Sequence, residues 1–130
     1  MKKLWVHRDI GAPPATVWEL LTDPHYWSEW GPTVREADVH GDRLQMGARG
    51  TVTTVAGVDL PFEITNYDEG SRWEWKVGGV PATDHTVEPS GPDSCRVGFG
   101  VPWPAAPYLA FCRLALERLE KMATAKNVTS

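Results

Sequence analysis

The sequence predicts an α+β fold in which helices cover one face of a strongly bent antiparallel sheet. Three patterns predict this fold. Residues 104–126 repeat apolar side chains at the spacing of one long amphipathic helix. Between residues 34 and 101, short runs rich in Val, Thr, Phe and Trp alternate with turn signals, which is typical of an antiparallel meander. Two short helical patterns lie between the first strand and this meander.

The length and composition predict one globular domain. The 130 residues are 42% hydrophobic, which is enough for one sizeable core. No linker or repeat divides the chain, so we expect a single domain over residues 1–130. Seven tryptophans are many for this length. Because Trp combines a large apolar area with a hydrogen-bond donor, they indicate either a lined pocket or interface, or simply the filling of a small core.

The charge pattern excludes several classes of partner. A net charge of −4 without blocks of like charge argues against nucleic acid, whose binding needs a basic stripe. His7, Arg8 and Asp9 interrupt the only run that begins like a signal peptide. No apolar stretch approaches the roughly 20 residues of a membrane span, so we expect a cytoplasmic location. Two cysteines are too few for a disulfide framework or a thiolate metal site, and we expect neither metal nor cofactor.

The N-terminal part is predicted to form one strand and two short helices. Residues 4–10 have the character of a strand. Prolines at positions 13 and 14 begin a helix that must end before Pro24, because a residue preceding proline is disfavoured in helical conformation. Asp23 can cap a second short helix that carries Tyr26, Trp27 and Trp30.

Alternation along the later strands indicates which side chains share the buried face. Turn signals with glycine at positions 41, 57, 70, 79 and 91 separate these strands. His85 is the only histidine whose parity matches an apolar face. The predicted inward set is Leu60, Phe62, Ile64, Asn66, Trp73, Trp75, Val77, His85, Val87, Val97, Phe99 and Val101.

The long helix over residues 104–126 has one apolar side. Pro104 suits its first position and Pro107 its first turn. Cys112 and Ala115 are small residues in the middle of the apolar stripe, where either a ligand or large side chains from the facing sheet can fill the space. The apolar side comprises Tyr108, Phe111, Cys112, Ala115, Leu116, Leu119, Met122 and Ala123.

The order of elements, together with several motifs, resembles the START-like or SRPBCC superfamily. The N-terminal signature consists of IGAPPATVWELLTDP at residues 10–24 and WSEWGP at residues 27–32. Later segments in the same style are FEITNY at residues 62–67, WEW at residues 73–75 and VEP at residues 87–89. The superfamily includes the polyketide cyclase/dehydrase and lipid-transport family and the birch-pollen-allergen group. The resemblance covers nearly the whole chain.

This resemblance implies the helix-grip fold, a curved seven-stranded antiparallel sheet wrapped around a long C-terminal helix. Two short helices would lie between the first and second strands, and a cavity for an apolar ligand between sheet and helix. Members bind lipids, sterols, hormones, quinones or polyketides, and some catalyse cyclisation or dehydration. No catalytic motif of the superfamily carries over residue by residue. The short chain predicts tight turns and a modest cavity.

Two residues are candidates for acid–base chemistry. His85 can act as acid or base near neutral pH, or it can be a structural histidine that bonds a backbone carbonyl or Tyr108. The hydroxyl of Tyr108 can bind a ligand carbonyl or donate a proton, or it can simply reach water. The other three histidines have no metal-ligand spacing.

The remaining candidates are predicted to hold a ligand. Trp73 and Trp75 would form an aromatic wall, and an inward Asn66 would offer a buried amide that needs partners. Arg49 is either a turn residue or a partner for an acidic ligand at the mouth. Cys112 has no electropositive neighbour in sequence and is interpreted as a small apolar residue. The predicted ligand-binding set is Arg49, Phe62, Asn66, Trp73, Trp75, Phe99, Phe111, Cys112 and Ala115.

Three functions therefore compete. The first is a protein that binds a small apolar or aromatic molecule of polyketide, lipid or quinone type. The second is a polyketide cyclase, aromatase or dehydratase in which His85 acts as base and Tyr108 or Asn66 stabilises the oxyanion. The third is a protein-interaction module, which predicts Trp5, Trp27 or Trp30 in one exposed patch.

Overall fold

The protein is described here by a computed structural model of residues 2–41 and 43–128, with side chains placed as far as residue 125. Seven strands form one sheet in the order β1-β7-β6-β5-β4-β3-β2, and all neighbouring strands are antiparallel. The strands are β1 (Lys3–Ile10), β2 (Val34–His40), β3 (Arg49–Thr54), β4 (Asp59–Asp68), β5 (Arg72–Val77), β6 (Val80–Gly91) and β7 (Ser94–Pro102).

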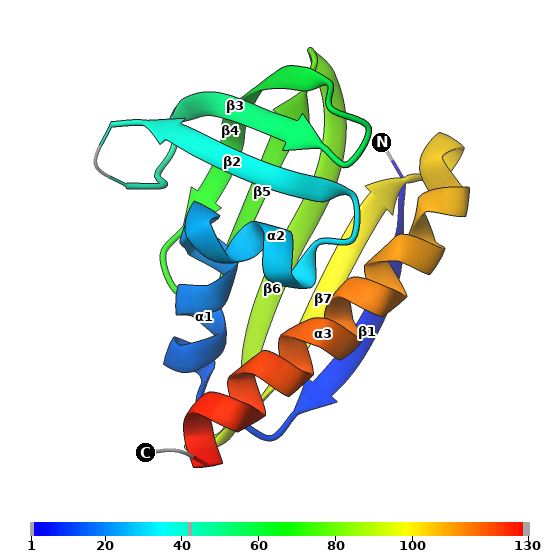
Figure 1. The fold of residues 1–130 in the computed structure, drawn as a ribbon. Coiled ribbons are helices and arrows are strands. Elements are labelled where there is room, and N and C mark those ends of the chain that lie inside the picture. The colour runs from blue at the N-terminus through cyan, green and yellow to red at the C-terminus, as the bar shows by residue number, and fades with distance from the viewer. Residues whose placement is uncertain (1, 42, 129–130) are drawn as a thin grey trace.

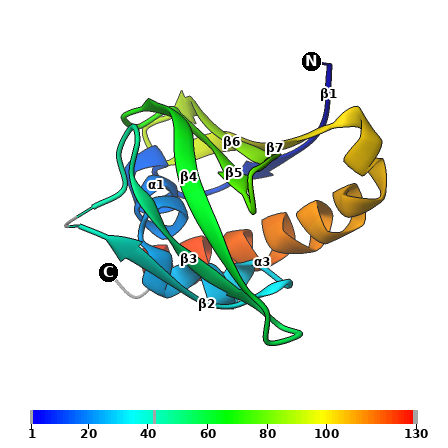
Figure 2. The same ribbon diagram turned by 90° about the horizontal axis from the view of Figure 1, so that it is seen from above.

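Helices lie on the concave side of this curved sheet (Figures 1 and 2). Helix α1 (Pro14–Thr22), the 3-10 turn η1 (Pro24–Tyr26) and helix α2 (Trp27–Trp30) connect β1 to β2. A second 3-10 segment, η2 (Trp103–Tyr108), leads from β7 into the long helix α3 (Leu109–Val128). The predicted helix-grip fold is therefore confirmed. No helix in the described part of the chain combines the length and the apolar character needed to cross a membrane.

The prolines and Asp23 define the ends of the N-terminal helices as predicted. Helix α1 begins at Pro14 and ends at Thr22, before Pro24. The Asp23 carboxylate then accepts a hydrogen bond of 3.0 Å from the backbone N–H of His25, which caps η1. Two sharp helix ends within ten residues turn the chain so that α2 can enter the concave side of the sheet.

The long helix begins five residues later than predicted. Pro104 and Pro107 lie in η2, and Ala105 departs from helical geometry with φ −96° and ψ 21°. A proline in an α-helix removes a backbone donor, and its ring clashes with the carbonyl four residues earlier. For this reason the prolines hold a kinked 3-10 segment, and α3 starts at Leu109.

Turn chemistry explains most strand ends. Gly78 and Gly79 join β5 to β6 with positive φ values of 60° and 79°, as a two-residue hairpin turn requires. The turn predicted at Gly91 is wrong, because β6 continues through Gly91 and the turn falls on Pro92 and Asp93. Both flanking residues, Gly91 and Ser94, remain paired across that turn.

Helix α2 covers much of the aromatic face of the sheet. Trp27 stacks on Trp73 with ring centroids 5.3 Å apart, and Trp30 lies 5.7 Å from Phe99. The indole N–H groups of Trp27 and Trp30 each donate to a carbonyl of α1, at 2.9 Å. We expected α3 to face this aromatic wall directly. Instead the two tryptophans of α2 are inserted between sheet and helix, and α3 packs chiefly against β1 and α2.

The burial of these tryptophans also contradicts the predicted interaction patch. Trp27 is 1% exposed and Trp30 6% exposed, whereas Trp5 is 37% exposed. Trp5 stacks on His7 along β1, on the outer face of the sheet. The three residues therefore do not form one exposed surface.

Candidate ligand-binding site

An uncharged groove opens at the end of the molecule where β7 runs into η2. It has a volume of about 350 Å³. Its walls are formed by residues of strands β2 to β7, by Thr33 and by two residues of η2. None of these described residues is Asp, Glu, Lys or Arg. The lining consists of Thr33, Val34, Val52, Thr54, Leu60, Trp75, Val77, Pro81, Ala82, Thr83, Val101, Pro102, Ala105 and Tyr108.

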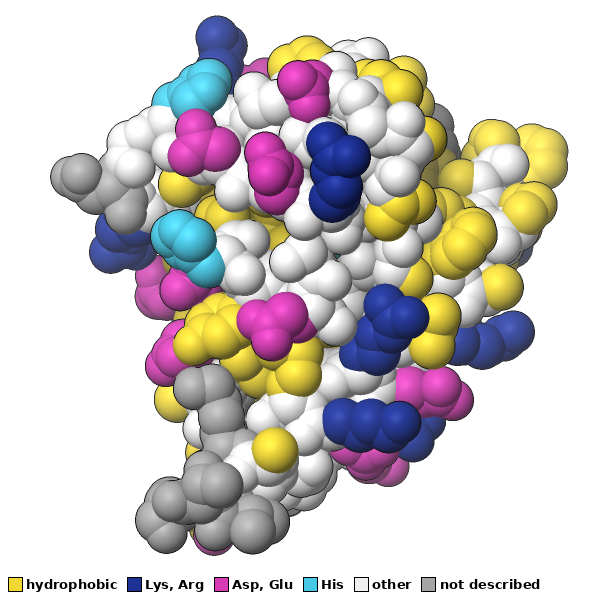
Figure 3. Space-filling view, viewed as in Figure 1, with side chains coloured by type: hydrophobic (Ala, Val, Ile, Leu, Met, Phe, Trp, Pro, Cys, Tyr) yellow, Lys and Arg dark blue, Asp and Glu magenta, His cyan; other side chains and the backbone are white. Residues whose placement is uncertain are grey.

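Three exposed apolar side chains are close in sequence to residues that line this groove. Val58, Val80 and Trp103 are 51%, 63% and 62% exposed, and each is one or two residues from a lining residue in sequence. Figure 3 shows hydrophobic side chains gathered over η2 and the first turns of α3. The elements that form the groove thus also carry exposed apolar side chains.

A smaller chamber of about 40 Å³ lies next to the groove, deeper in the fold. Five residues line both spaces, so the two adjoin: Thr33, Val34, Trp75, Thr83 and Tyr108. The remaining walls of the chamber are Trp27, Trp30, Gly31, Pro32, Trp73, His85, Phe99, Phe111, Cys112 and Ala115.

Tyr108 spans the junction of groove and chamber. Its hydroxyl lies 2.7 Å from the hydroxyl of Thr33, in the segment between α2 and β2. Burial raises the pKa of Tyr108, and the hydrogen bond to Thr33 opposes this only in part. The phenol is therefore neutral, and its hydrogen bond with Thr33 ties η2 to the opposite wall.

His85 is a neutral histidine at the chamber wall. It is 2% exposed, and its ring stacks on Trp73 with centroids 3.8 Å apart. Burial lowers the pKa of His85 to about 4, against the opposing effect of a hydrogen bond to the Trp73 carbonyl. Nδ1 lies 3.1 Å from that carbonyl oxygen. A carbonyl only accepts, so Nδ1 carries the proton and Nε2 carries a lone pair.

Two chamber residues have buried donors without acceptors. The indole nitrogens of Trp73 and Trp75 have no hydrogen-bond partner among the described residues. Trp73 is enclosed between the rings of Trp27 and His85. Trp75 is 9% exposed and lines both the groove and the chamber. Such groups are uncommon, because an unpaired buried donor loses its bond to water and gains nothing.

Most of the predicted site residues lie together around these two spaces. His85, Tyr108, Trp73, Trp75, and Phe99 line the chamber. So do Phe111, Cys112 and Ala115 of α3, although Phe111 is 46% exposed. Burial raises the pKa of the Cys112 thiol to about 11, which leaves it protonated. Phe62 is buried under Trp27 and Trp75 instead of lining either space.

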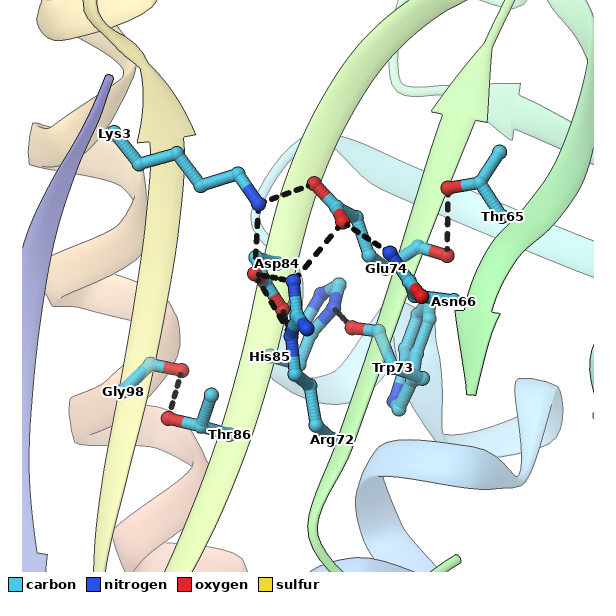
Figure 4. Close-up of polar contacts among 10 residues, drawn as sticks. All are labelled: Lys3, Thr65, Asn66, Arg72, Trp73, Glu74, Asp84, His85, Thr86 and Gly98. Carbon is cyan, nitrogen blue, oxygen red and sulfur yellow. Dashed lines mark hydrogen bonds and ion pairs between the residues drawn. The ribbon is translucent and has the colours of Figure 1, made fainter. Parts of the chain in front are cut away.

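The expected inward placement of Asn66 is wrong. Its amide nitrogen donates to the Glu74 carboxylate at 3.0 Å, on the outer face (Figure 4). The β4–β5 register shifts between Ile64 and Asn66, and a bulge of one residue reverses the facing of every side chain beyond it. Tyr67 accordingly takes the inward position and contacts Trp18.

The placement of Arg49 at the mouth of the cavity is also wrong. Arg49 lies opposite Glu63 on the outer face, with 3.8 Å between Nη2 and the carboxylate oxygen. Its side chain is 72% exposed. The inward position next to it in β3 belongs to Gly50, which faces the Phe62 ring.

Several residues of the chamber lining were not predicted as site residues: Trp27, Trp30, Gly31, Pro32, Thr33, Val34 and Thr83. Trp27 and Trp30 were expected to close the end of the core, yet they also line the chamber. Their spacing of three on one short helix already placed them on a common face. Thr83 lies two residues before His85 in β6, so strand alternation also predicted that Thr83 faces inward.

The charged residues nearest to His85 lie on the opposite face of the sheet (Figure 4). The Asp84 carboxylate is 1% exposed and accepts hydrogen bonds of 2.9 Å from both Arg72 Nε and Lys3 Nζ. Burial alone would raise the pKa of Asp84, but the bonds from Arg72 and Lys3 outweigh it and lower that pKa. Glu74 joins the same network through Lys3 and Arg72.

A second groove, of about 910 Å³, lies between α1, η1, β2 and β4 and is wide and polar. At its wall the Glu69 carboxylate accepts hydrogen bonds from Trp18 at 2.7 Å, Tyr67 at 2.9 Å and Arg43 at 2.8 Å. These bonds lower the pKa of Glu69, with that from Tyr67 the largest cause. Among the described residues that line this groove, no buried side-chain nitrogen or oxygen lacks a hydrogen-bond partner.

The fold has many counterparts among solved structures. Protein XoxI from Bacillus cereus has a TM-score of 0.72 at 13% identity, over 95% of this chain and 96% of that chain. A protein from Mesorhizobium loti has a TM-score of 0.71 at 18% identity, over 92% and 95%. A protein from Nitrosomonas europaea has a TM-score of 0.68 at 16% identity, over 97% and 96%. At these identities the likeness is one of fold.

The sequence itself identifies the family. No curated protein matches the chain. The family model described as "Polyketide cyclase / dehydrase and lipid transport" matches residues 1–126, and its fold suggests the binding of hydrophobic ligands. The chain belongs to the polyketide cyclase/dehydrase and lipid-transport family.

Proposed function

We propose that the protein binds a small apolar or aromatic molecule, of polyketide, lipid or quinone type, in the groove between the sheet and η2. The observation that carries this proposal is the groove of about 350 Å³ with a lining free of charged side chains among the described residues. This volume falls at the lower end of the roughly 300–1,000 Å³ found for small-molecule sites. We also propose a cytoplasmic location for the protein.

The driving force for such binding is the removal of apolar surface from water. Each square ångström of apolar surface that ligand and groove bury contributes about 25 cal/mol. The exposed side chains of Val58, Val80 and Trp103 offer an incoming molecule further apolar surface on the elements that form the groove. A charged ligand would lose its hydration in this groove without gaining a counter-charge.

Filling the groove tests this proposal. Ala105 lines the groove, whereas its neighbour Ala106 does not. We expect Ala105→Trp to abolish the ligand adducts that native mass spectrometry detects after incubation with an apolar cell extract. Ala106→Trp is the matched control and should retain them. Equal adducts in both variants, or no adduct and no thermal stabilisation in the unmodified protein, would contradict binding in this groove.

A second candidate function is cyclisation or dehydration of a poly-β-keto chain. The observation that favours it is the convergence of His85 and Tyr108 with two unpaired indole donors around one chamber. His85 Nε2 would take a proton from the carbon beside a carbonyl, and the enolate would be stabilised by N–H and O–H donors. After the enolate carbon attacks a second carbonyl, the imidazolium returns the proton to the new alkoxide, which becomes a hydroxyl. His85 then takes the second proton from the same carbon and passes it to that hydroxyl, so that a C=C bond forms, the C–O bond breaks and water leaves.

The variant His85→Ala distinguishes the two functions. If the protein is a cyclase, the variant should lose most of the cyclised product formed from a poly-β-keto thioester, while still binding the substrate. Tyr108→Phe should slow the same reaction, because it removes one donor near the developing oxyanion. An unchanged rate and product distribution in His85→Ala would sink the catalytic assignment and leave the binding function intact.

A further inference from the structure

Two buried donors on residues that line the chamber lack an acceptor. The indole nitrogens of Trp73 and Trp75 have no partner among the described residues, whereas those of Trp27 and Trp30 reach backbone carbonyls at 2.9 Å. The four indoles share one aromatic cluster. Since the indole N–H groups of Trp27 and Trp30 have backbone acceptors, the unpaired N–H groups of Trp73 and Trp75 point to an acceptor that comes from outside the chain.

The chamber beside these donors has room for one small polar group. Its volume of about 40 Å³ is close to the roughly 30 Å³ that one water occupies in the liquid. Trp75, Thr83 and Tyr108 line both the chamber and the groove. A molecule held in the groove therefore lies against residues that also form the wall of the chamber.

The uncharged lining of the chamber favours a neutral polar group over an ion. Among the described residues its lining includes no Asp, Glu, Lys or Arg. His85 contributes a neutral imidazole, since Nδ1 donates to the Trp73 carbonyl at 3.1 Å. The closest cations, Lys3 and Arg72, are held by Asp84 and Glu74 on the other face. A carboxylate in the chamber would be desolvated without a counter-ion.

We propose that the chamber is a recognition site for the carbonyl oxygen of a neutral ketone or quinone, with the Trp75 indole N–H as its principal donor. This inference rests on the proposed binding function and names the class of ligand. The apolar body of the molecule lies in the groove, and its carbonyl oxygen accepts from Trp75 at the junction. Trp73 supplies a second donor from the chamber wall.

Three compounds with one bicyclic body test the inference: tetralin, α-tetralone and tetralin carboxylate. The first has no acceptor, the second has a neutral carbonyl and the third has an anion. We expect α-tetralone to bind about tenfold more tightly than tetralin, since it satisfies a buried donor, and the carboxylate to bind more weakly than either. In a spectrum of the nitrogen-15 indole groups, α-tetralone should move the Trp75 N–H downfield, and tetralin should not.

Trp75→Phe removes the donor and keeps an aromatic wall. In this variant the preference for α-tetralone over tetralin should fall to within about twofold. Trp5→Phe, on the outer face of the sheet, is the matched control and should keep the full preference. Should Trp75→Phe fail to fold, the Trp75 indole signal of the unmodified protein decides the question by itself.

Each other outcome counts against the inference. If tetralin and α-tetralone bind equally and the Trp75 signal stays in place, the groove binds ligands but the carbonyl site does not exist. A water contact that persists at the Trp75 N–H in the α-tetralone complex would assign the acceptor to solvent and overturn the inference as well. If none of the three compounds binds, the proposed function fails and the inference fails with it.

Discussion

Two neighbouring residues of β6 separate charge from the candidate site. Asp84 and His85 point to opposite faces of the sheet, as successive residues of a strand do. Asp84 is ionised and held by Arg72 and Lys3, and His85 is neutral beside the chamber. One peptide unit thus divides an ionic network from an uncharged cavity.

The first prediction concerns stability and pH at His85. Its pKa is about 4 in the folded protein and 6.5 ordinarily, so the unfolded chain binds the proton more readily. The stability that depends on the neutral ring is fully present above pH 6.5 and is lost as pH falls towards pH 4. We expect a loss of about 3 kcal/mol across this range, measured by denaturant unfolding.

The variant His85→Asn keeps a donor near the Trp73 carbonyl but cannot titrate. It should lose the pH dependence between pH 4 and pH 6.5, even if it is less stable at neutral pH. His25→Asn is the control, since His25 is 93% exposed and its replacement should leave the pH dependence in place. If the unfolding free energy of His85→Asn fell with pH as steeply as that of the unmodified protein, His85 would not be the titrating group.

The second prediction concerns the buried carboxylate of Asp84. Asp84→Asn leaves Arg72 and Lys3 without the charge that pairs them, so we expect a loss of roughly 1–3 kcal/mol in the free energy of unfolding. The pKa of Asp84 is lowered from 3.8. Its stabilisation is therefore present above pH 3.8 and lost as pH falls further, below the range in which His85 acts.

Glu63→Gln provides the comparison for Asp84→Asn. Glu63 pairs with Arg49 and Lys76 at 3.8 Å and 3.5 Å on the surface, and its loss should change stability by no more than about 0.5 kcal/mol. Equal effects of the two substitutions in urea unfolding at neutral pH would show that burial adds nothing to the Asp84 network.

At the scale of elements, one hydrogen bond joins η2 to the segment after α2. The third prediction is a coupling of about 1 kcal/mol between Tyr108→Phe and Thr33→Val, because each substitution removes one hydroxyl of the 2.7 Å pair. A double-mutant cycle of unfolding free energies measures it. Amide exchange should also quicken at residues 31–34 in either single variant. Additive effects of the two substitutions would mean that the bond contributes no stability.

Strand alternation predicted the site well until a strand departed from regular pairing. Trp73, Trp75, His85 and Phe99 have the predicted facing. The β5–β6 register also shifts, but the extra residue lies in β6 between Pro81 and Asp84, outside the Trp73–His85 and His85–Phe99 pairs. Asn66 does not, because the register shift after Ile64 reverses its facing. A bulge depends on the pairing of two strands, and a single strand's pattern of apolar residues does not reveal it.

The start of the long helix was mispredicted for a related reason. Its apolar spacing holds from Leu109 onward, and Tyr108 fits the same stripe from the end of η2. Two prolines three residues apart are compatible with a first helical turn or with a 3-10 segment. The structure has the 3-10 segment, with the departure from helical geometry at Ala105.

At the scale of the molecule, the order of strands and helices was predictable and the filling of the interior was not. The motifs of residues 10–32 carry the resemblance to the family, and the family model matches residues 1–126. The small residues Cys112 and Ala115 left open whether a ligand or a side chain faces α3. Trp27 and Trp30 of α2 take much of that space, and Cys112 and Ala115 line the chamber of about 40 Å³ beside them.

The fourth prediction follows from this filling. Trp27 is 1% exposed and contacts Phe62, Trp73 and Trp75, so Trp27→Ala should cost about 3–5 kcal/mol. The space it leaves adjoins the chamber, and the variant should accept ligands too bulky for the unmodified protein. Trp103→Ala, at an exposed tryptophan, is the control for loss of an indole. Thermal unfolding with and without bulky apolar compounds measures both effects, and a Trp27→Ala protein of unchanged stability would contradict the packing described here.

The stack of Trp27, Trp73 and His85 also gives the molecule an optical signature. The two indoles lie 5.3 Å apart and within 13° of parallel, so their electronic transitions couple and produce paired circular dichroism bands of opposite sign. The His85 ring lies 3.8 Å from Trp73, and a protonated imidazole at that distance quenches indole emission. Dichroism thus reports the integrity of the interior and fluorescence reports the proton on His85, both without an added label.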